Sequence, residues 1–257
     1  MSQVGQIAQA FPYSSFIPFY TNGLKISNDA TTPNTLVDIA IGSTLDSTGT
    51  FQISLTSPIV ANIAVNGLNG LDTGTVAAST VYAIYLVADP VTNQPSGCIL
   101  STSLTGPLMP FGYSAYKLIG YITTDSMSHF LLGYWTSGNN GSRLFMYDAP
   151  QATAVTAGAA TSYTAVSLAK WVPAINLTPV WIYSSYVPAT AGNTLKMQPF
   201  VGTGDAITVT GQVATKAMTQ NTLLFESLNS GAPTISYKVS NGSDTAAINV
   251  AGYQFIL

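Results

Sequence analysis

Acid–base catalysis in this chain would have to start from a single histidine, His129, which follows Asp125 by four residues in "TTDSMSHFLLGY". A carboxylate at that spacing could orient an imidazole, but covalent catalysis also needs a nucleophile. No serine stands in a nucleophile-elbow pattern, and the one cysteine, Cys98, lies between a turn and a predicted strand. We therefore expect His129 to be structural, Cys98 to be a small buried residue, and the protein not to be an enzyme.

Paired carboxylates could in principle hydrolyse glycosidic bonds, and the chain has ten acidic residues. Nine are aspartates in surroundings rich in Asn, Gly, Thr and Pro, which are typical of turns. The tenth, Glu226, is expected to point outward from the strand-like segment "LLFESL". A glycan depolymerase is therefore only a remote alternative.

The sequence implies no cofactor and no metal. One cysteine and one histidine exclude a zinc cluster built on cysteines, and no Asp-x-Asp-x-Asp calcium loop is present. The segment "GTGD" at 202–205 lacks the lysine and the following helix of a phosphate loop, so it predicts a hairpin turn. Calcium held between loops of symmetry-related subunits is the one alternative that stays open.

Charged residues make up 7% of the chain, against roughly a quarter in an ordinary soluble protein. No uncharged apolar run approaches the roughly 18–20 residues needed to span a bilayer, so we expect no membrane insertion. The net charge of −3 gives no basic surface for nucleic acid. A surface with so little charge favours a protein whose surface is covered by identical neighbours or by a larger assembly. The alternative is a secreted monomer with a polar surface.

Apolar residues in this chain recur at every second position, as they do in a β-strand with one buried face. In "GTFQISLTS", residues 49–57, Phe51, Ile53 and Leu55 alternate with polar residues. A dozen or so similar segments rich in β-branched and aromatic residues are separated by Gly, Pro, Asn or Ser, and only "TSYTAVSLAKWV" could be either helix or strand. The pattern predicts an all-β protein of two antiparallel β-sandwich, jelly-roll-like domains.

A turn-rich and then small-residue stretch at 136–162 marks the expected boundary between domains at 21–136 and 143–257. Residues 1–20 belong to neither pattern, because "AFPYSSFIPFY" gathers aromatic rings around two prolines. Such an extended arm can pack on its own domain or dock into a neighbour. If it anchors the protein to a larger particle, the anchoring residues are Phe11, Tyr13, Phe16, Phe19 and Tyr20.

The stretch "GLDTGTVAASTVYAIYLVAD", residues 70–89, combines a turn with a strand that is apolar on both faces. Asp72 can bind its own backbone in the turn before Gly74. A strand that is apolar on both faces lies in a sheet that is covered on both faces. We take Val81, Tyr85 and Val87, on one face, as candidates for a subunit interface.

Three segments that lie within about residues 22–130 share a pattern: "NGLKISNDATTPNTLVDIAIGSTLDSTGTFQISL", "GLDTGTVAASTVYAIYLVAD" and "GYSAYKLIGYITTDSMSHF". Together they resemble a module of bacteriophage tail-fibre, head-fibre and related virion surface proteins. Where the family often continues with Gly-Asp and a Trp-rich strand, "LLGYWTSGNN" keeps the Trp and lacks the Asp. This departure falls at the expected domain junction.

The resemblance implies a homotrimeric structural protein of a bacteriophage virion, made in the bacterial cytoplasm and bound to capsid or tail proteins through its arm. Without a repetitive shaft, a compact capsid decoration, head fibre or short tail fibre is favoured over a long fibre. The alternative is a receptor-recognition module that binds a host surface glycan. Trp135, Trp171 and Trp181 are the candidate sugar-stacking residues for that role, against core packing for each.

Overall fold

The structure of the chain is a computed structural model, and it describes residues 20–91, 94–137, 141–148, 152–175, 178–200 and 207–256. These residues form β-strands joined by turns and bends, as the sequence predicted for an all-β protein. The described part contains no helix that is long and apolar enough to cross a membrane. The segment "TSYTAVSLAKWV" is also free of helix and contributes a short strand followed by turns.

Two small sheets cover one side of the N-terminal half. The first has three strands in the order β1-β4-β5, and the second has four in the order β10-β8-β9-β7. Their bounds are Thr21–Gly23 (β1), Gly42–Leu45 (β4), Gln52–Leu55 (β5), Ala115–Thr123 (β10), Val81–Ala88 (β8), Gly97–Ser101 (β9) and Gly70–Leu71 (β7). All neighbours in these sheets are antiparallel except β7 and β9.

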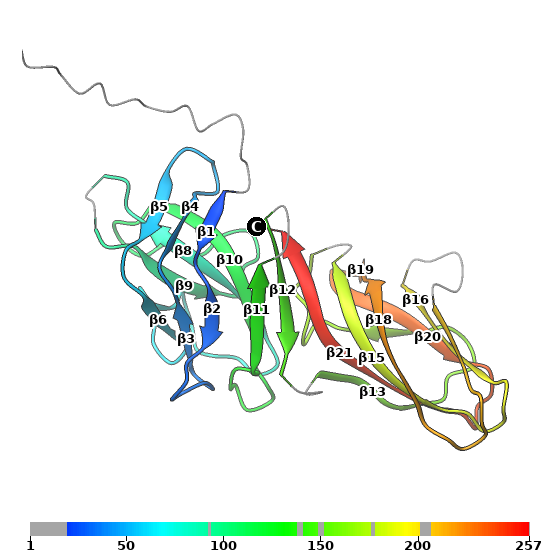
Figure 1. The fold of residues 1–257 in the computed structure, drawn as a ribbon. Helices are drawn as coiled ribbons and strands as arrows, with labels where there is room; N and C mark the ends of the chain where they lie inside the picture. Colours follow the sequence, from blue (N-terminus) through cyan, green and yellow to red (C-terminus); the bar gives the residue numbers. More distant parts are fainter. Residues whose placement is uncertain are drawn as a thin grey trace, which may run out of the picture.

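A nine-stranded antiparallel sheet runs through both halves of the chain. Its order is β18-β15-β21-β12-β11-β2-β3-β6, and β13 also pairs with β21. The bounds are Met218–Phe225 (β18), Pro179–Val187 (β15), Thr245–Ile256 (β21), Ser142–Tyr147 (β12), Gly133–Ser137 (β11), Ile26–Asn28 (β2), Leu36–Ile39 (β3), Ile59–Asn62 (β6) and Ala152–Gly158 (β13). Figure 1 shows β1 to β6 and β8 to β10 in one lobe, β13, β15, β16 and β18 to β21 in the other, and β11 and β12 between them.

A five-stranded sheet completes the C-terminal lobe, with the order β14-β20-β16-β17 and β19 paired to β20. The bounds are Thr164–Ser167 (β14), Ala232–Val239 (β20), Thr194–Pro199 (β16), Ile207–Thr210 (β17) and Ser227–Asn229 (β19). Its buried side chains, among them Leu195, Met197 and Ile235, join the same apolar core as those of β15 and β21. The C-terminal half is therefore a sandwich of two packed sheets.

The alternation in the sequence predicts which side chains are buried. In β5, Ile53 and Leu55 are buried whereas Gln52 and Ser54 are exposed. In β15, buried and half-buried side chains alternate over all nine residues. This regularity leaves one face of β15 outside the sandwich, where it can contribute to a surface site.

The expected domain boundary falls within a hairpin of the nine-stranded sheet. Strands β11 and β12 pair from Gly133 with Tyr147 to Ser137 with Arg143, and β12 then pairs with β21. Buried apolar residues of both halves also belong to one contiguous core. The two sandwiches thus share a sheet, and their independence as folding units stays a prediction.

Candidate functional site

The candidate site is a groove of about 410 Å³ on the C-terminal lobe, within the range usual for small-molecule sites. Strand β12 leaves β21 after Met146, and β13 takes over the pairing with β21 at Val250. The change of partner places the end of β12 beside β15, β21 and β18, which supply the rest of the lining. The groove is lined by Tyr147, Asp148, Tyr183, Asn221, Asn249, Val250 and Ala251.

A row of polar and aromatic side chains crosses four strands in this groove. Tyr183 of β15 stands in register with Asn221 of β18 on one side and with Asn249 of β21 on the other. Asn249 is in turn opposite Thr153 of β13. Because residues in register lie on one face of a sheet, the four side chains form a continuous line.

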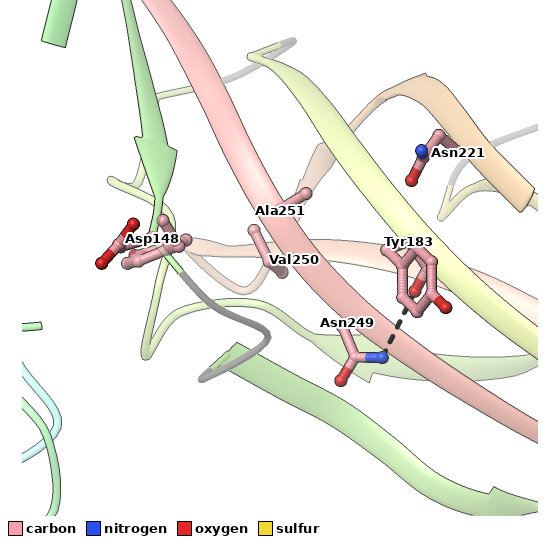
Figure 2. A pocket seen from close by; sticks show the side chains of 7 residues that line it. Asp148, Tyr183, Asn221, Asn249, Val250 and Ala251 are labelled. Atoms are coloured by element: carbon pink, nitrogen blue, oxygen red, sulfur yellow. Dashed lines mark hydrogen bonds between the residues drawn. The ribbon is translucent and has the colours of Figure 1, made fainter. Parts of the chain in front are cut away.

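Hydrogen bonds fix the middle of this row. Thr153 Oγ1 donates to Asn249 Oδ1 at 2.7 Å, and Asn249 Nδ2 donates to the carbonyl oxygen of Tyr183 at 3.4 Å. Asn249 is 8% exposed, and these two bonds hold its side-chain amide between β13 and β15. Figure 2 shows this contact beside the ring of Tyr183.

Three polar groups of the groove have no side-chain hydrogen bond within the described residues: the Tyr183 hydroxyl, the Asn221 amide and the Asp148 carboxylate. Asn221 and Asp148 are exposed, and Tyr183 is half-buried. In Figure 2, Asp148 lies on one side of β21, with Tyr183 and Asn221 on the other. A ligand in the groove would meet hydrogen-bonding groups from both sides.

Apolar side chains extend the same face beyond Tyr183. Trp181, two residues earlier on β15, is half-buried and stands opposite Leu223, which is 46% exposed. Phe225, two residues further along β18, is 50% exposed. The face therefore combines an apolar area with a polar, hydrogen-bonding area.

A second groove, of about 520 Å³, lies on the β1-β4-β5 sheet next to the point where the arm begins. It is lined by Asn22, Gly23, Ile41, Gly42, Ser43, Gln52, Ser54, Leu55 and Thr56. Of the predicted anchoring residues, Phe11, Tyr13, Phe16 and Phe19 lie outside the described residues. Tyr20 is fastened to β4, since its carbonyl oxygen accepts bonds from Leu45 N at 3.3 Å and Thr44 Oγ1 at 3.0 Å.

His129 and Asp125 are close, but the contact belongs to a turn. His129 Nδ1 lies 3.8 Å from Asp125 Oδ2, and Asp125 Oδ1 accepts from the backbone N–H groups of Met127 and His129. Cys98 is fully buried, as predicted, and burial raises the pKa of its thiol far above the ordinary value. "GTGD" at 202–205 lies outside the described residues.

Five aspartates bind nearby backbone N–H groups at turns, as their sequence context predicts: Asp29, Asp46, Asp89, Asp125 and Asp244. Asp46, for example, accepts from the backbone N–H groups of Thr50 and Phe51 and from Thr48 Oγ1, and these bonds outweigh burial and lower its pKa. The prediction is wrong for Asp38, which lies within the strand Leu36–Ile39, and Asp205 lies outside the described residues. Asp72 departs from expectation, because it binds across the fold to Ser101 Oγ at 2.6 Å and Leu108 N at 3.1 Å.

The prediction for Glu226 is wrong, because this side chain is fully buried rather than pointing outward. The chain crosses here from β18 to β19, which belong to different sheets, and the strand alternation does not continue through the crossing. The backbone N–H of Thr178 donates to Glu226 Oε1 at 3.0 Å. Burial nevertheless raises the pKa of the Glu226 carboxyl.

Within the described residues, no cluster of three His, Cys, Asp or Glu side chains could hold a metal ion.

Tyr85 and Val87 are not available to a partner subunit, which corrects the expectation for these two residues. Both are at most 1% exposed within the single chain. Tyr85 donates to the carbonyl oxygen of Ser103 at 2.9 Å and its ring meets Tyr116 edge-on at 5.7 Å. The segment after β9 therefore supplies the cover that was expected from another subunit. Val81 is half-buried and stays a candidate.

The tryptophans occupy three different environments. Trp135 is a core residue, 5% exposed, and its Nε1 donates to the carbonyl oxygen of Tyr121 at 3.0 Å. Trp171 is half-buried beside the core, where its carbonyl oxygen accepts from the Tyr147 hydroxyl. Trp181 alone of the three shares the face that carries the groove.

Tyr183, Asn221 and Asn249 were not predicted, because only the pairing of β15 with two distant strands brings them together.

No protein-family description matches this sequence, and neither does any curated protein. Among solved structures, a carbohydrate-binding module of Cellvibrio mixtus lichenase 5A, in complex with cellotriose, has 13% identity and a TM-score of 0.25, covering 47% of this chain and 86% of its own. A structure of infectious bursal disease virus has 12% identity and a TM-score of 0.22, covering 89% and 70%. A mutant VP2 protein of that virus has 11% identity and a TM-score of 0.19, covering 91% and 67%. At these TM-scores the similarities carry no functional conclusion.

Proposed function

We propose that this chain is a non-enzymatic structural protein of a bacteriophage virion, bound as a trimer to the capsid or tail through its N-terminal arm. It would serve as a capsid decoration, a head fibre or a short tail fibre. The motifs at residues 22–130 that resemble virion surface proteins suggest this role.

The observation that carries the proposal is that the polar residues of those motifs form hydrogen bonds within the fold. Asp72 bridges Ser101 and Leu108, and Asp125 closes the turn to His129. Thr124 Oγ1 donates to the carbonyl oxygen of Ala77 at 2.7 Å. These groups hold turns and strand ends instead of converging on one pocket, which supports a structural role.

The place where the arm joins the fold supports the attachment mechanism. Tyr20 is hydrogen-bonded to β4, so the 19 residues before it start from a fixed point beside the groove on the β1-β4-β5 sheet. In a trimer, three arms would act together, and their joint binding would exceed that of one arm.

Carbohydrate recognition is a second candidate, and the groove at Tyr183 favours it. An aromatic ring beside amide and hydroxyl groups that make no side-chain hydrogen bond among the described residues is a chemistry that suits sugars. The two roles are compatible, because a protein anchored on a particle at one end can present the other lobe to a host surface.

Location on the particle can be tested directly. We expect an antibody against the purified chain to label intact phage particles in electron micrographs, and a reconstruction of the particle to show the chain in multiples of three at one kind of site. Particles made without the gene should lose the label. Purified particles that contain no trace of the chain by mass spectrometry would refute the virion role.

A further inference from the structure

The lining of the C-terminal groove is almost without charge. Among the described residues that line it, Asp148 is the only ionisable side chain apart from two tyrosines, and none is a lysine or arginine. A phosphate, sulfate or carboxylate on a ligand would therefore find no cation and would be repelled by Asp148. Ligands that bind through charge, including nucleic acid, are disfavoured.

The centre of the groove also differs from a peptide-binding edge, although Asn221 lies on the edge strand β18. Tyr183 and Asn249 lie on β15 and β21, which are inner strands with a partner on each side, so their backbone groups are already paired. A peptide adding to the sheet would need an unpaired edge. What the groove offers instead is side chains: the phenol rings of Tyr147 and Tyr183, two amides and a carboxylate.

We propose that this groove binds a neutral oligosaccharide, with a sugar ring stacked on Tyr183 and its hydroxyl groups bonded to Asn221 and Asp148. The proposal deepens the second candidate above, carbohydrate recognition, and rests on it. An uncharged sugar has an apolar C–H face and a rim of hydroxyl groups. These match the ring of the groove and its polar groups that have no side-chain hydrogen bond within the described part of the chain.

Asn249 would act as a positioning residue in this site. Its bonds to Thr153 and to the Tyr183 carbonyl oxygen tie β13, β21 and β15 together under the sugar. The rigidity matters, because a preformed site does not lose binding energy in ordering its side chains. Trp181 and Leu223 continue the face, so a longer chain of sugars has an apolar surface to follow.

The test uses the full-length protein and saturation-transfer NMR with defined probes. These are neutral oligosaccharides of glucose, galactose, mannose and N-acetylglucosamine, each beside a sulfated or sialylated counterpart. Tyr183→Ala removes the platform, whereas Tyr183→Phe keeps the ring and loses only the hydroxyl. Asn221→Ala removes one amide. Tyr134→Ala is the matched control, because Tyr134 is 52% exposed on β11 and lies outside the groove.

We expect at least one neutral probe to bind. Tyr183→Ala should weaken the affinity for that probe about tenfold, or about 1.4 kcal/mol. The affinities of Tyr183→Phe and Tyr134→Ala should stay within about threefold of that of the unmodified protein. Asn221→Ala should weaken binding by about threefold to tenfold. Binding of none of the neutral probes, preference for the charged counterparts, or full binding by Tyr183→Ala would each overturn the proposal. Particle labelling is independent of all these variants, so the virion role can stand if the sugar site fails.

Discussion

Arg143 Nη1 donates a hydrogen bond to the carbonyl oxygen of Ile119 at 3.0 Å, which ties β12 to the irregularity in β10 where the register shifts between Leu118 and Gly120. The same guanidinium donates to the carbonyl oxygens of Leu24 at 2.9 Å and Gly23 at 3.2 Å. Arg143 is 4% exposed, and burial lowers its pKa to about 10. Arg143, at the expected start of the second domain, thus satisfies backbone carbonyl groups of the first domain.

We expect Arg143→Met to lower the free energy of unfolding by about 2–4 kcal/mol, because the buried carbonyl oxygens of Leu24 and Ile119 and the part-buried one of Gly23 lose a charged donor. Urea unfolding measures the difference. Lys216→Met, which removes the same charge from an exposed position, should change stability by less than about 0.5 kcal/mol. Equal stability of the two variants would show that Arg143 does not join the halves.

Asp244 makes a second set of buried bonds that can be tested by pH. Its carboxylate accepts from Tyr186 Oη, Ala189 N, Asn193 Nδ2 and Asn241 N at 2.7–3.1 Å. Burial alone would raise its pKa, but these bonds to the charged form outweigh burial and lower it.

Because the folded-state pKa of Asp244 lies below that of the unfolded chain, its stabilisation is complete above about pH 4 and is lost as pH falls through the folded value. We expect Asp244→Asn to cost about 2–4 kcal/mol at pH 7 and the difference from the unmodified protein to shrink below about pH 4. Urea unfolding at several pH values measures this. A difference that is constant from pH 7 to the acid limit would contradict it, and Asp148→Asn serves as the exposed control.

Cys98 should be unreactive in the native protein, because its thiol is fully buried and burial raises its pKa. We expect iodoacetamide to modify it only in denaturant, with mass spectrometry as the measurement. Replacing Cys98 and His129 together with Ala should change stability by no more than a few kcal/mol and leave any binding activity intact. Rapid labelling in native buffer, or loss of binding by a folded double variant, would show a role beyond packing.

The arm deletion follows the structural boundary. Tyr20 is bonded to β4, so removal of residues 1–19, and not of Tyr20, should leave a folded protein whose mass by light scattering is three times that of the shortened chain. We expect this protein to fail to bind to particles that lack it, because each aromatic ring of the arm can bury roughly 150–250 Å² at an attachment contact. Co-sedimentation with such particles measures this. Equal incorporation of truncated and full-length protein would remove the anchoring role.

A single substitution tests the joint action of the arms. Phe16→Ala would be repeated in all three chains of a trimer, so we expect it to weaken attachment by more than one lost contact would. Titration of particles with the variant and the unmodified protein gives the ratio of affinities. A monomer mass for the unmodified protein at micromolar concentration would contradict both the trimer and this effect.

The local features of this protein could be predicted from its sequence. Alternation of side chains such as Ile53 and Ser54 fixes which face of a strand is buried, since successive side chains of a strand point to opposite faces. Turns at Asp46 and Asp125 follow from short polar side chains that bind nearby backbone. The burial of Cys98 follows from its small apolar character.

Tertiary structure decided what depends on partners distant in the chain. The apolar faces around Tyr85 suggested a subunit contact, but the segment after β9 covers them within the chain. Glu226 is buried because the chain changes sheet at that residue. The groove exists because Tyr183 meets Asn221 and Asn249 across three strands that are up to 66 residues apart in sequence. Strand pairing sets such neighbours, and alternation within one strand contains no information about which strand will pair with it.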